Sequence, residues 1–398
     1  MHNLFPGNLA SFVCGTTFGW TSPEIPKLKL TVDNPLAVPL TASEEGWVGS
    51  LLPLGAAIGP FMAGIAADKF GRKKTLLVAS VPFILAFVLN ILASDVKYFF
   101  ASRFLCGLAV GSVFTVIPMY IGEIADDEVR GSLADQREAA EKSLSKLRGK
   151  PINDIQKELE AIRSTVEEAL ANKASFFDIF KSRGLKMALF LSVGLVAMQQ
   201  FSGINIILFY TQDIFTDAGV SLPPEICTIA IGVVQILASA ATPVLVDRKG
   251  KRFLLLLSAV GMGLSQAVIA YFFYLKDDKH SDISAIGWIP IVSLIVYIVT
   301  YCLGFGPLPW AVMGELFPGN IKSVASTVTA SGCWVLGFLL TNYFGMVTGL
   351  IGKSGSFGIF SVCCVIATVF TYKLVPETSG KSLQEIQDIL NGNTNDKD

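Results

Sequence analysis

Charged residues are scarce in this sequence. Only 16% of its 398 residues are Asp, Glu, Lys or Arg, whereas an ordinary soluble domain has about 25%. The mean hydropathy is +0.57. The formal net charge of −1 provides no basic field that would attract nucleic acid. This composition predicts a protein that lies in a lipid bilayer and does not bind nucleic acid.

Residues that build metal and catalytic centres are also few or unsuitably placed. The two histidines, His2 and His280, lie at the terminus and in a polar segment. We find no nucleophile–base pair, metal-ligand cluster or phosphate-binding glycine loop, so we predict no enzyme, no metal and no cofactor. The cysteines fall in apolar runs without metal-site spacing and are expected to be small buried hydrophobic residues. They are Cys14, Cys106, Cys227, Cys302, Cys333, Cys363 and Cys364.

Long apolar runs make up most of the chain. A membrane-spanning helix needs about 20 mostly apolar residues. The first run has no basic flank and no small-residue cleavage site, so we interpret it as a short span and not a signal peptide. We predict an all-α membrane protein with about ten spans, at residues 4–20, 47–67, 75–94, 98–121, 186–208, 225–246, 253–275, 286–313, 323–345 and 355–374.

The distribution of lysine and arginine predicts the orientation of these spans. The short loops 68–74 and 247–252 are basic, and basic loops stay in the cytoplasm. An even number of spans then places both termini in the cytoplasm as well. The segments 21–46 and 276–285 are expected outside, although both contain lysine.

The charged loops belong to an internal repeat, a common feature of transporters. Each half has an Asp-x-x-Gly turn followed by two bases, and then a Gly-Glu pair with a base seven residues after the Glu. Both turns lie on the same side of the membrane, so the halves are parallel repeats. The repeated residues are Asp68, Gly71, Arg72, Lys73, Glu123 and Arg130 in the first half, and Asp247, Gly250, Lys251, Arg252, Glu315 and Lys322 in the second.

The two halves differ in length. After its Gly-Glu turn the second half has two more spans, whereas the first half continues into a polar segment. The repeat therefore predicts a six-plus-six protein that lacks spans five and six. Apolar residues three and four apart within 135–172 predict that the polar segment is helical. The predicted domains are an N-terminal bundle of four spans at 1–124, a cytoplasmic helical linker at 125–185, a C-terminal bundle of six spans at 186–375 and a cytoplasmic tail at 376–398.

Several stretches together resemble the sugar porters of the major facilitator superfamily, and in particular insect facilitated transporters of trehalose or glucose. They are "GIAADKFGRKK", "RFLCGLAVGSVFTVIPMYIGEIADDEVRG", "QQFSGINIILFY", "VDRKGKR", "GFGPLPWAVMGELFP" and "VPETSGKSLQEIQ". The resemblance implies a major-facilitator-type helical bundle in the cell membrane that carries a sugar by alternating access. It also implies twelve spans, so the gap in the repeat is a departure from the family.

The duplicated turns have a mechanical interpretation. Two bundles of a transporter rock about a site near the midplane, and charged turns at their cytoplasmic ends can latch them in one state, a pairing that the resemblance also implies. A simpler alternative is that the bases only follow the positive-inside rule, which does not explain the repeated acids. The predicted latch comprises both sets of repeated residues together with Glu377.

Three amides lie close together in the span at 186–208: Gln199, Gln200 and Asn205. Amides both donate and accept hydrogen bonds, as sugar hydroxyls do, and in a membrane they must face protein or a wet cavity. An alternative is that they only join helices. The resemblance implies that these three side chains bind sugar. It also implies a role for Gln235, which stands where the family usually has an asparagine.

The run "GFGPLPW" at 304–310 predicts a hinge. Pro307 and Pro309 lack backbone donors and kink a helix, as a moving helix requires. Trp310 offers a flat apolar face and an indole N–H to a sugar ring, although a lone membrane tryptophan is also typical of an interfacial anchor. Trp334 is a further candidate for the sugar site.

Two cysteines depart from the pattern of the family. Cys333 stands where an asparagine often precedes the tryptophan, and Cys302 replaces a common acid. Both changes remove polar contacts, so the choice between trehalose and hexoses stays open.

Two functions remain from this reasoning. The first is a facilitative uniporter for trehalose or a hexose, because the first span has no Asp, Glu or His and proton coupling needs an ionisable group at membrane depth. The second is a transport-inactive sugar sensor or regulatory partner that assembles with itself or with full-length transporters, because a cavity without span five lacks one wall.

Overall fold

The structure, a computed structural model, describes residues 5–31, 34–36, 38–126, 179–180, 182–220, 222–381 and 383–392. These residues form helices joined by turns and loops, without a strand among them. Eight of the described helical segments are long and apolar enough to cross a membrane, which confirms an all-α membrane protein. The prediction of ten spans is not settled by this count, because α1 is short and the last segment, Val324–Leu374, contains a kink at Gly352.

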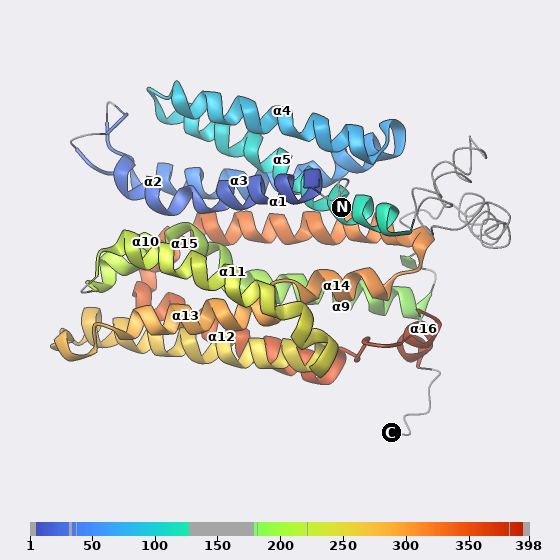
Figure 1. The fold of residues 1–398 in the computed structure, drawn as a ribbon. Helices are drawn as coiled ribbons and strands as arrows, with labels where there is room; N and C mark the ends of the chain where they lie inside the picture. The colour runs from blue at the N-terminus through green and yellow to red at the C-terminus, as the bar shows by residue number, and fades with distance from the viewer. Residues whose placement is uncertain are drawn as a thin grey trace, which may run out of the picture.

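The first half of the chain forms a layer of helices drawn in blue to turquoise (Figure 1). The capping box of Thr41 and Glu44, which satisfies backbone donors at both positions, starts the long α3 helix. The helices of this half are α1 (Phe5–Gly19), α2 (Thr21–Leu28), α3 (Ala42–Phe70), α4 (Arg72–Ile91) and α5 (Val96–Asp126).

The second half forms the remaining helices, drawn in green to red (Figure 1). Two of its spans are broken, between α9 and α10 and between α13 and α14. The helices are α9 (Arg183–Phe201), α10 (Ile204–Ala218), α11 (Pro224–Lys249), α12 (Lys251–Phe273), α13 (Ile289–Leu303), α14 (Leu308–Leu316), α15 (Gly319–Leu374) and α16 (Leu383–Asn391), with short turns η2 (Tyr274–Asp278) and η3 (Ser284–Ile286).

The charged turns of the two halves have the same backbone conformation. Gly71, between α3 and α4, has φ 83° and ψ 156°, and Gly250, between α11 and α12, has φ 79° and ψ 162°. A positive φ is accessible to glycine without the steric penalty that a side chain brings. Both turns lie at the end of the molecule where α16 also lies (Figure 1). The repeat is therefore present in the backbone as well as in the sequence.

Small residues bring α3 and α5 into close contact. A Cβ atom on Gly107 would lie 2.1 Å from the carbonyl oxygen of Leu52, and one on Gly55 would lie 2.3 Å from that of Phe104. Four residues further along each helix, a Cβ atom on Gly59 or Gly111 would lie 2.6 or 2.3 Å from a facing carbonyl oxygen. This is the small-residue packing that joins membrane helices, where dispersion replaces the hydrophobic effect as the attractive force.

The halves meet along α3 and α15, and through α10, which contacts α1 and α2. The repeat makes α11 the counterpart of α3, but the two helices differ in burial. In an apolar stretch of 18 residues, 61% of α3 is buried inside the protein, compared with only 11% of α11. The helix α11 packs on α10, α12 and α13 of its own half.

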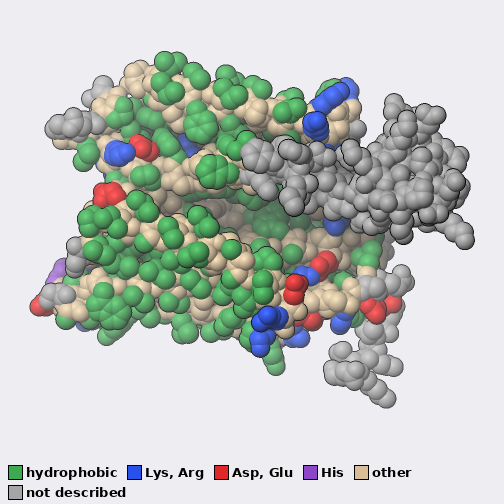
Figure 2. All heavy atoms as spheres, in the orientation of Figure 1, with side chains coloured by type: hydrophobic (Ala, Val, Ile, Leu, Met, Phe, Trp, Pro, Cys, Tyr) green, Lys and Arg blue, Asp and Glu red, His purple; other side chains and the backbone are tan. Residues whose placement is uncertain are grey.

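Apolar side chains cover most of the face of the molecule shown in Figure 2, as a lipid-facing surface requires. Lysine and arginine gather at the end with the charged turns. The surface is hollowed between the two halves (Figure 2). The predicted linker falls almost entirely outside the described residues.

Candidate functional site

The break between α9 and α10 lies in the middle of a span and is satisfied by side chains. Gly203 adopts the left-handed conformation, with φ 81° and ψ 14°. The carbonyl oxygen of Ser202 accepts hydrogen bonds from Gln266 Nε2 at 2.8 Å and from the Tyr297 hydroxyl at 3.0 Å. Because no water is present in the bilayer core, these partners make the break tolerable there.

The backbone groups at the break between α13 and α14 find hydrogen-bond partners on α9 and α12. Gln199 Nε2, on α9, donates to the carbonyl oxygen of Gly306 at 2.9 Å and also to that of Phe305. The backbone N–H of Phe305 donates to Ser258 Oγ at 3.0 Å. Pro307 is the N-cap of α14 and Pro309 lies in its first turn, so the two predicted hinge residues sit directly after this break.

The three predicted amides are buried and lie together. Gln200 Nε2 donates to Cys333 Sγ at 3.1 Å, and Asn205 Nδ2 donates to Gln200 Oε1 at 2.7 Å. The helix α15 approaches this pair through Gly337, where an added Cβ would lie 2.8 Å from Asn205 Nδ2. Gln199 has its amide donors engaged with the α13–α14 break, and its oxygen is left with a weak 3.9 Å contact from Cys333 Sγ.

Trp334 lies beside Cys333 in a layer of aromatic rings between the halves. Its ring stacks on Phe18 of α1, with centroids 5.8 Å apart and planes at 11°, and meets Phe114 of α5 edge-on at 6.0 Å. Phe18 also stacks on Phe209 of α10 at 6.3 Å. Trp334 is only 6% exposed, yet its Nε1 has no hydrogen-bond partner among the described residues. The layer therefore contains a buried indole N–H that donates to none of the described residues.

Gln235 and Trp310 lie apart from this cluster. Gln235 lines a groove of about 570 Å³ with Tyr301, Cys302 and Pro307. Tyr301 connects the groove to the amides, because its hydroxyl accepts from Gln199 Nε2 at 3.3 Å. The lining of this groove does not include Trp310, which is half-buried against the core.

The second charged turn is held by carboxylates from two other segments. Lys251 Nζ forms an ion pair with Glu315. Glu377 accepts hydrogen bonds from the backbone N–H groups of Lys251 at 3.1 Å and Arg252 at 3.0 Å, at the start of α12. Burial alone would raise the pKa of Glu377, but hydrogen bonds from Ser379, Arg252 and Lys251 outweigh it and hold the pKa below its usual range.

Other predicted latch residues are only partly described. In the first turn Arg72 donates to the carbonyl oxygen of Ala67 at 3.3 Å, and Lys73 lines an apolar pocket beside α1. In the second half Asp247 lines the groove of Gln235 and Lys322 is exposed. The side chains of Asp68 and Glu123, and all of Arg130, lie outside the described residues.

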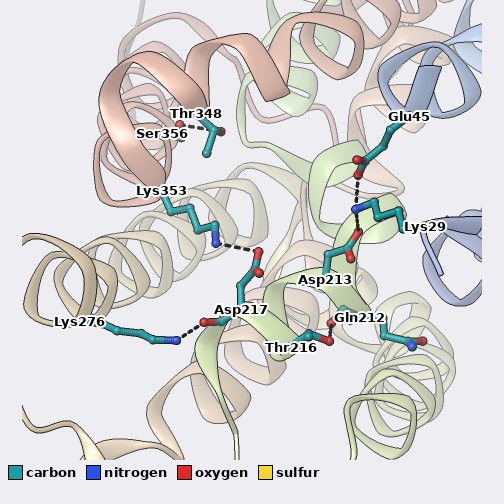
Figure 3. Close-up of polar contacts among 10 residues, drawn as sticks. All are labelled: Lys29, Glu45, Gln212, Asp213, Thr216, Asp217, Lys276, Thr348, Lys353 and Ser356. Atoms are coloured by element: carbon teal, nitrogen blue, oxygen red, sulfur yellow. Dashed lines mark hydrogen bonds and ion pairs between the residues drawn. The ribbon is translucent and has the colours of Figure 1, made fainter. Parts of the chain in front are cut away.

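Sequence reasoning missed two charged features. Arg103 is almost fully buried and donates to the carbonyl oxygen of Thr17 at 2.8 Å and to Thr21 Oγ1 at 2.7 Å. Its presence inside a span was the available signal. At the end opposite the charged turns, Lys29 lies between Glu45 and Asp213 (Figure 3). Lysine in a segment expected outside was the only hint of this bridge.

Comparison with known proteins identifies the family. The sugar (and other) transporter family matches residues 9–135 and 133–390. The chain belongs to this sugar transporter family. A facilitated trehalose transporter, Tret1, from Polypedilum vanderplanki is 34% identical over 436 residues, which cover 96% of this chain and 86% of the relative. Tret1 of Culex quinquefasciatus is 32% identical, with 96% and 83% covered.

Solved sugar transporter structures have the same fold. The proton:xylose symporter XylE bound to 6-bromo-6-deoxy-D-glucose superposes with a TM-score of 0.74 at 20% identity, covering 98% of this chain and 99% of that one. Inward-open XylE from E. coli gives a TM-score of 0.71 at 20% identity, covering 97% and 98%. The major-facilitator fold is thus confirmed. The relatives are sugar porters and not enzymes, so this multi-pass membrane protein is a sugar transporter family member and not an enzyme.

Proposed function

We propose that this protein carries trehalose or a hexose across the cell membrane as a uniporter, by alternating access. The buried donor of Trp334 carries the proposal, because it lies between the halves, beside the residue that contacts Gln200. A buried polar atom without a protein partner is unfavourable unless a ligand or a water molecule satisfies it. The trehalose transporters among the relatives support the choice of substrate class.

Uniport is supported by the surroundings of Arg103. The hydrogen bonds of its guanidinium go to neutral acceptors: Thr17 O, Thr21 Oγ1 and, at 3.2 Å, Val48 O. A proton-coupled mechanism needs a group that takes up and releases a proton at membrane depth. A carboxylate beside this arginine would be such a group, and none of the hydrogen bonds just named involves one.

The predicted absence of spans five and six is the basis of a second candidate function. The family matches in two segments that meet at residues 133–135, where the repeat predicts the gap. The alignment with the Polypedilum relative extends over 436 residues although this chain has 398, so the relative has at least 38 positions without a counterpart. The exposed α11 agrees with a lost neighbour. A chain of this kind would act as a sugar sensor or as a regulatory partner that assembles with itself or with full-length transporters.

Sugar uptake separates the two functions. Vesicles that contain the 398-residue chain are expected to take up radiolabelled trehalose or glucose down a gradient, at a rate that an imposed pH difference does not change. Sugar uptake no faster than background, in vesicles that contain a normal amount of the protein, would exclude the transporter. Labelling of residues 68–74 or 247–252 from the cytoplasmic side only would support cytoplasmic termini.

A further inference from the structure

The end of the molecule opposite the charged turns contains a cavity of about 570 Å³ that both halves line. Its charged residues are Lys29 and Glu45 from the first half, and Asp213, Asp217 and Lys353 from the second. Figure 3 shows these side chains pointing toward one another in two groups. By the orientation predicted from the basic loops, this end faces the outside of the cell.

A single ammonium group links the two halves here. Lys29 follows α2, and its Nζ lies 2.8 Å from Glu45 Oε1, in the first turn of α3. The same Nζ lies 3.3 Å from Asp213 Oδ2 on α10. The Lys29 side chain is 35% exposed and each carboxylate side chain 20%. Salt and water therefore screen this bridge less than an ion pair on an open surface.

Backbone and side-chain contacts bring the halves together around this bridge. The helix α10 is kinked at Tyr210, which has φ −118° and ψ 18°. Two residues later, the backbone N–H of Gln212 donates to Ser22 Oγ of α2 at 3.1 Å. On α3, Ser50 Oγ donates to Asn342 Oδ1 of α15 at 3.1 Å, and Ser50 is completely buried. These contacts hold the two halves together at this end of the molecule.

A matching ion pair one turn further along α10 does not cross between the halves. Asp217 Oδ2 lies 2.7 Å from Lys353 Nζ, and both residues belong to the second half. Positions four apart on a helix lie on the same face. Asp213 and Asp217 thus share one face and one cavity, but only Asp213 joins the first half to the second.

We propose that Lys29 is a further residue of the transport cycle, and that its bridge from Glu45 to Asp213 keeps this end closed. The bridge must break before the halves can separate here, while the Asp217–Lys353 pair moves with the second half. A partly exposed ion pair contributes little free energy, so it can break and re-form in every cycle. This assignment rests on the proposed function, because it treats closure of this end as a step of alternating access. The closure itself can be measured without any transport.

The test places a reporter thiol at the closed contact. Ser50→Cys in the full chain is labelled with a membrane-impermeant maleimide added from outside to intact cells, and the unmodified chain gives the background of the native cysteines. Lys29→Met or Asp213→Asn in the Ser50→Cys protein is expected to raise the labelling rate by about fivefold, which corresponds to loss of about 1 kcal/mol. Lys353→Met, which breaks the pair within the second half, is expected to leave the rate unchanged.

A charge exchange protects the test against simple misfolding. Lys29→Glu combined with Asp213→Lys recreates an inter-half pair and is expected to return labelling toward the parent rate, whereas each change alone raises it. Equal labelling of the parent and Lys29→Met proteins at equal surface expression would overturn the proposal. So would an increase of the same size in Lys353→Met. Absence of sugar uptake by the parent chain would contradict the proposed function but would leave the labelling result interpretable.

Discussion

At the scale of single residues, Trp334 is the member of the aromatic layer that has a polar atom without a partner. Its indole Nε1 is buried without a partner among the described residues, while its ring is well packed on Phe18 and Phe114. Trp334→Phe would keep much of the stacking and remove the donor. Because one hydrogen bond is worth about 1 kcal/mol, we expect the KM for sugar to rise about fivefold. The amount of folded protein in the membrane is expected to change little.

Trp288 provides the matched control, because it is exposed beside η3 and far from the cluster in sequence. Trp288→Phe is expected to leave KM unchanged in the same uptake assay. Equal KM values for the Trp334→Phe and parent proteins would show that this donor does not contact the sugar.

The residue types of the candidate site could be predicted from the sequence, but their partners could not. Amide side chains in an apolar span stand out in the sequence because placing them in a membrane costs free energy. Nothing local shows that Gln199 supports a break 106 residues away, at Phe305. Gln199, Gln200 and Asn205 therefore remain candidates for sugar binding, with Gln199 also holding α14 in place.

At the scale of helices, the α3–α5 contact depends on the absence of side chains. Gly107→Ala would place a methyl group 2.1 Å from the Leu52 carbonyl oxygen, so the helices must separate. Overpacking of this kind destabilises by about 1–3 kcal/mol. We expect a lower unfolding temperature for the purified protein. Gly64→Ala is the control, because a Cβ there meets nothing within 4 Å; an equal fall for both variants would contradict the packing argument.

A second prediction at this scale concerns the start of α12, which Glu377 caps from 126 residues away. Hydrogen bonds hold the pKa of Glu377 below its usual range. The carboxylate therefore stabilises the folded state fully above the ordinary glutamate pKa of about 4.3, and loses this effect as the pH falls through its lowered value. The difference in unfolding temperature between the parent and Glu377→Gln proteins should be constant near neutral pH and shrink on acidification. A difference that grows on acidification would refute this assignment.

At the scale of the whole molecule, the low burial of α11 compared with α3 agrees with the prediction that the first half lacks two spans. Insertion of two spans near residue 133 should restore a full first half. A cysteine at Leu237, an exposed position on α11, should then react more slowly with a lipid-soluble maleimide. A cysteine at Leu264, exposed on α12, should react as before. Sugar uptake should rise together with this protection, and protection without uptake would favour the sensor or regulatory partner.

Much of the helical architecture follows from hydropathy and the repeat. Membrane spans need long apolar runs, and turns with a positive φ favour glycine. The predicted run at 253–275, for example, corresponds to α12, Lys251–Phe273. Contacts between distant segments do not follow in this way. Lys29 and Asp213 are 184 positions apart, and only the packing of α2 on α10 brings their charges together.

The two broken spans support each other, and this arrangement constrains how the second half can move. Gln199 lies on α9 and satisfies the break before α14, while Tyr297 lies on α13 and satisfies the break before α10. Bending either span therefore removes hydrogen-bond partners from both. The helices α10 and α14 lie toward opposite ends of the molecule (Figure 1). A movement of one of them is therefore expected to be accompanied by a movement of the other, so that the openings at the two ends change together. The membrane barrier would then never be open at both mouths together.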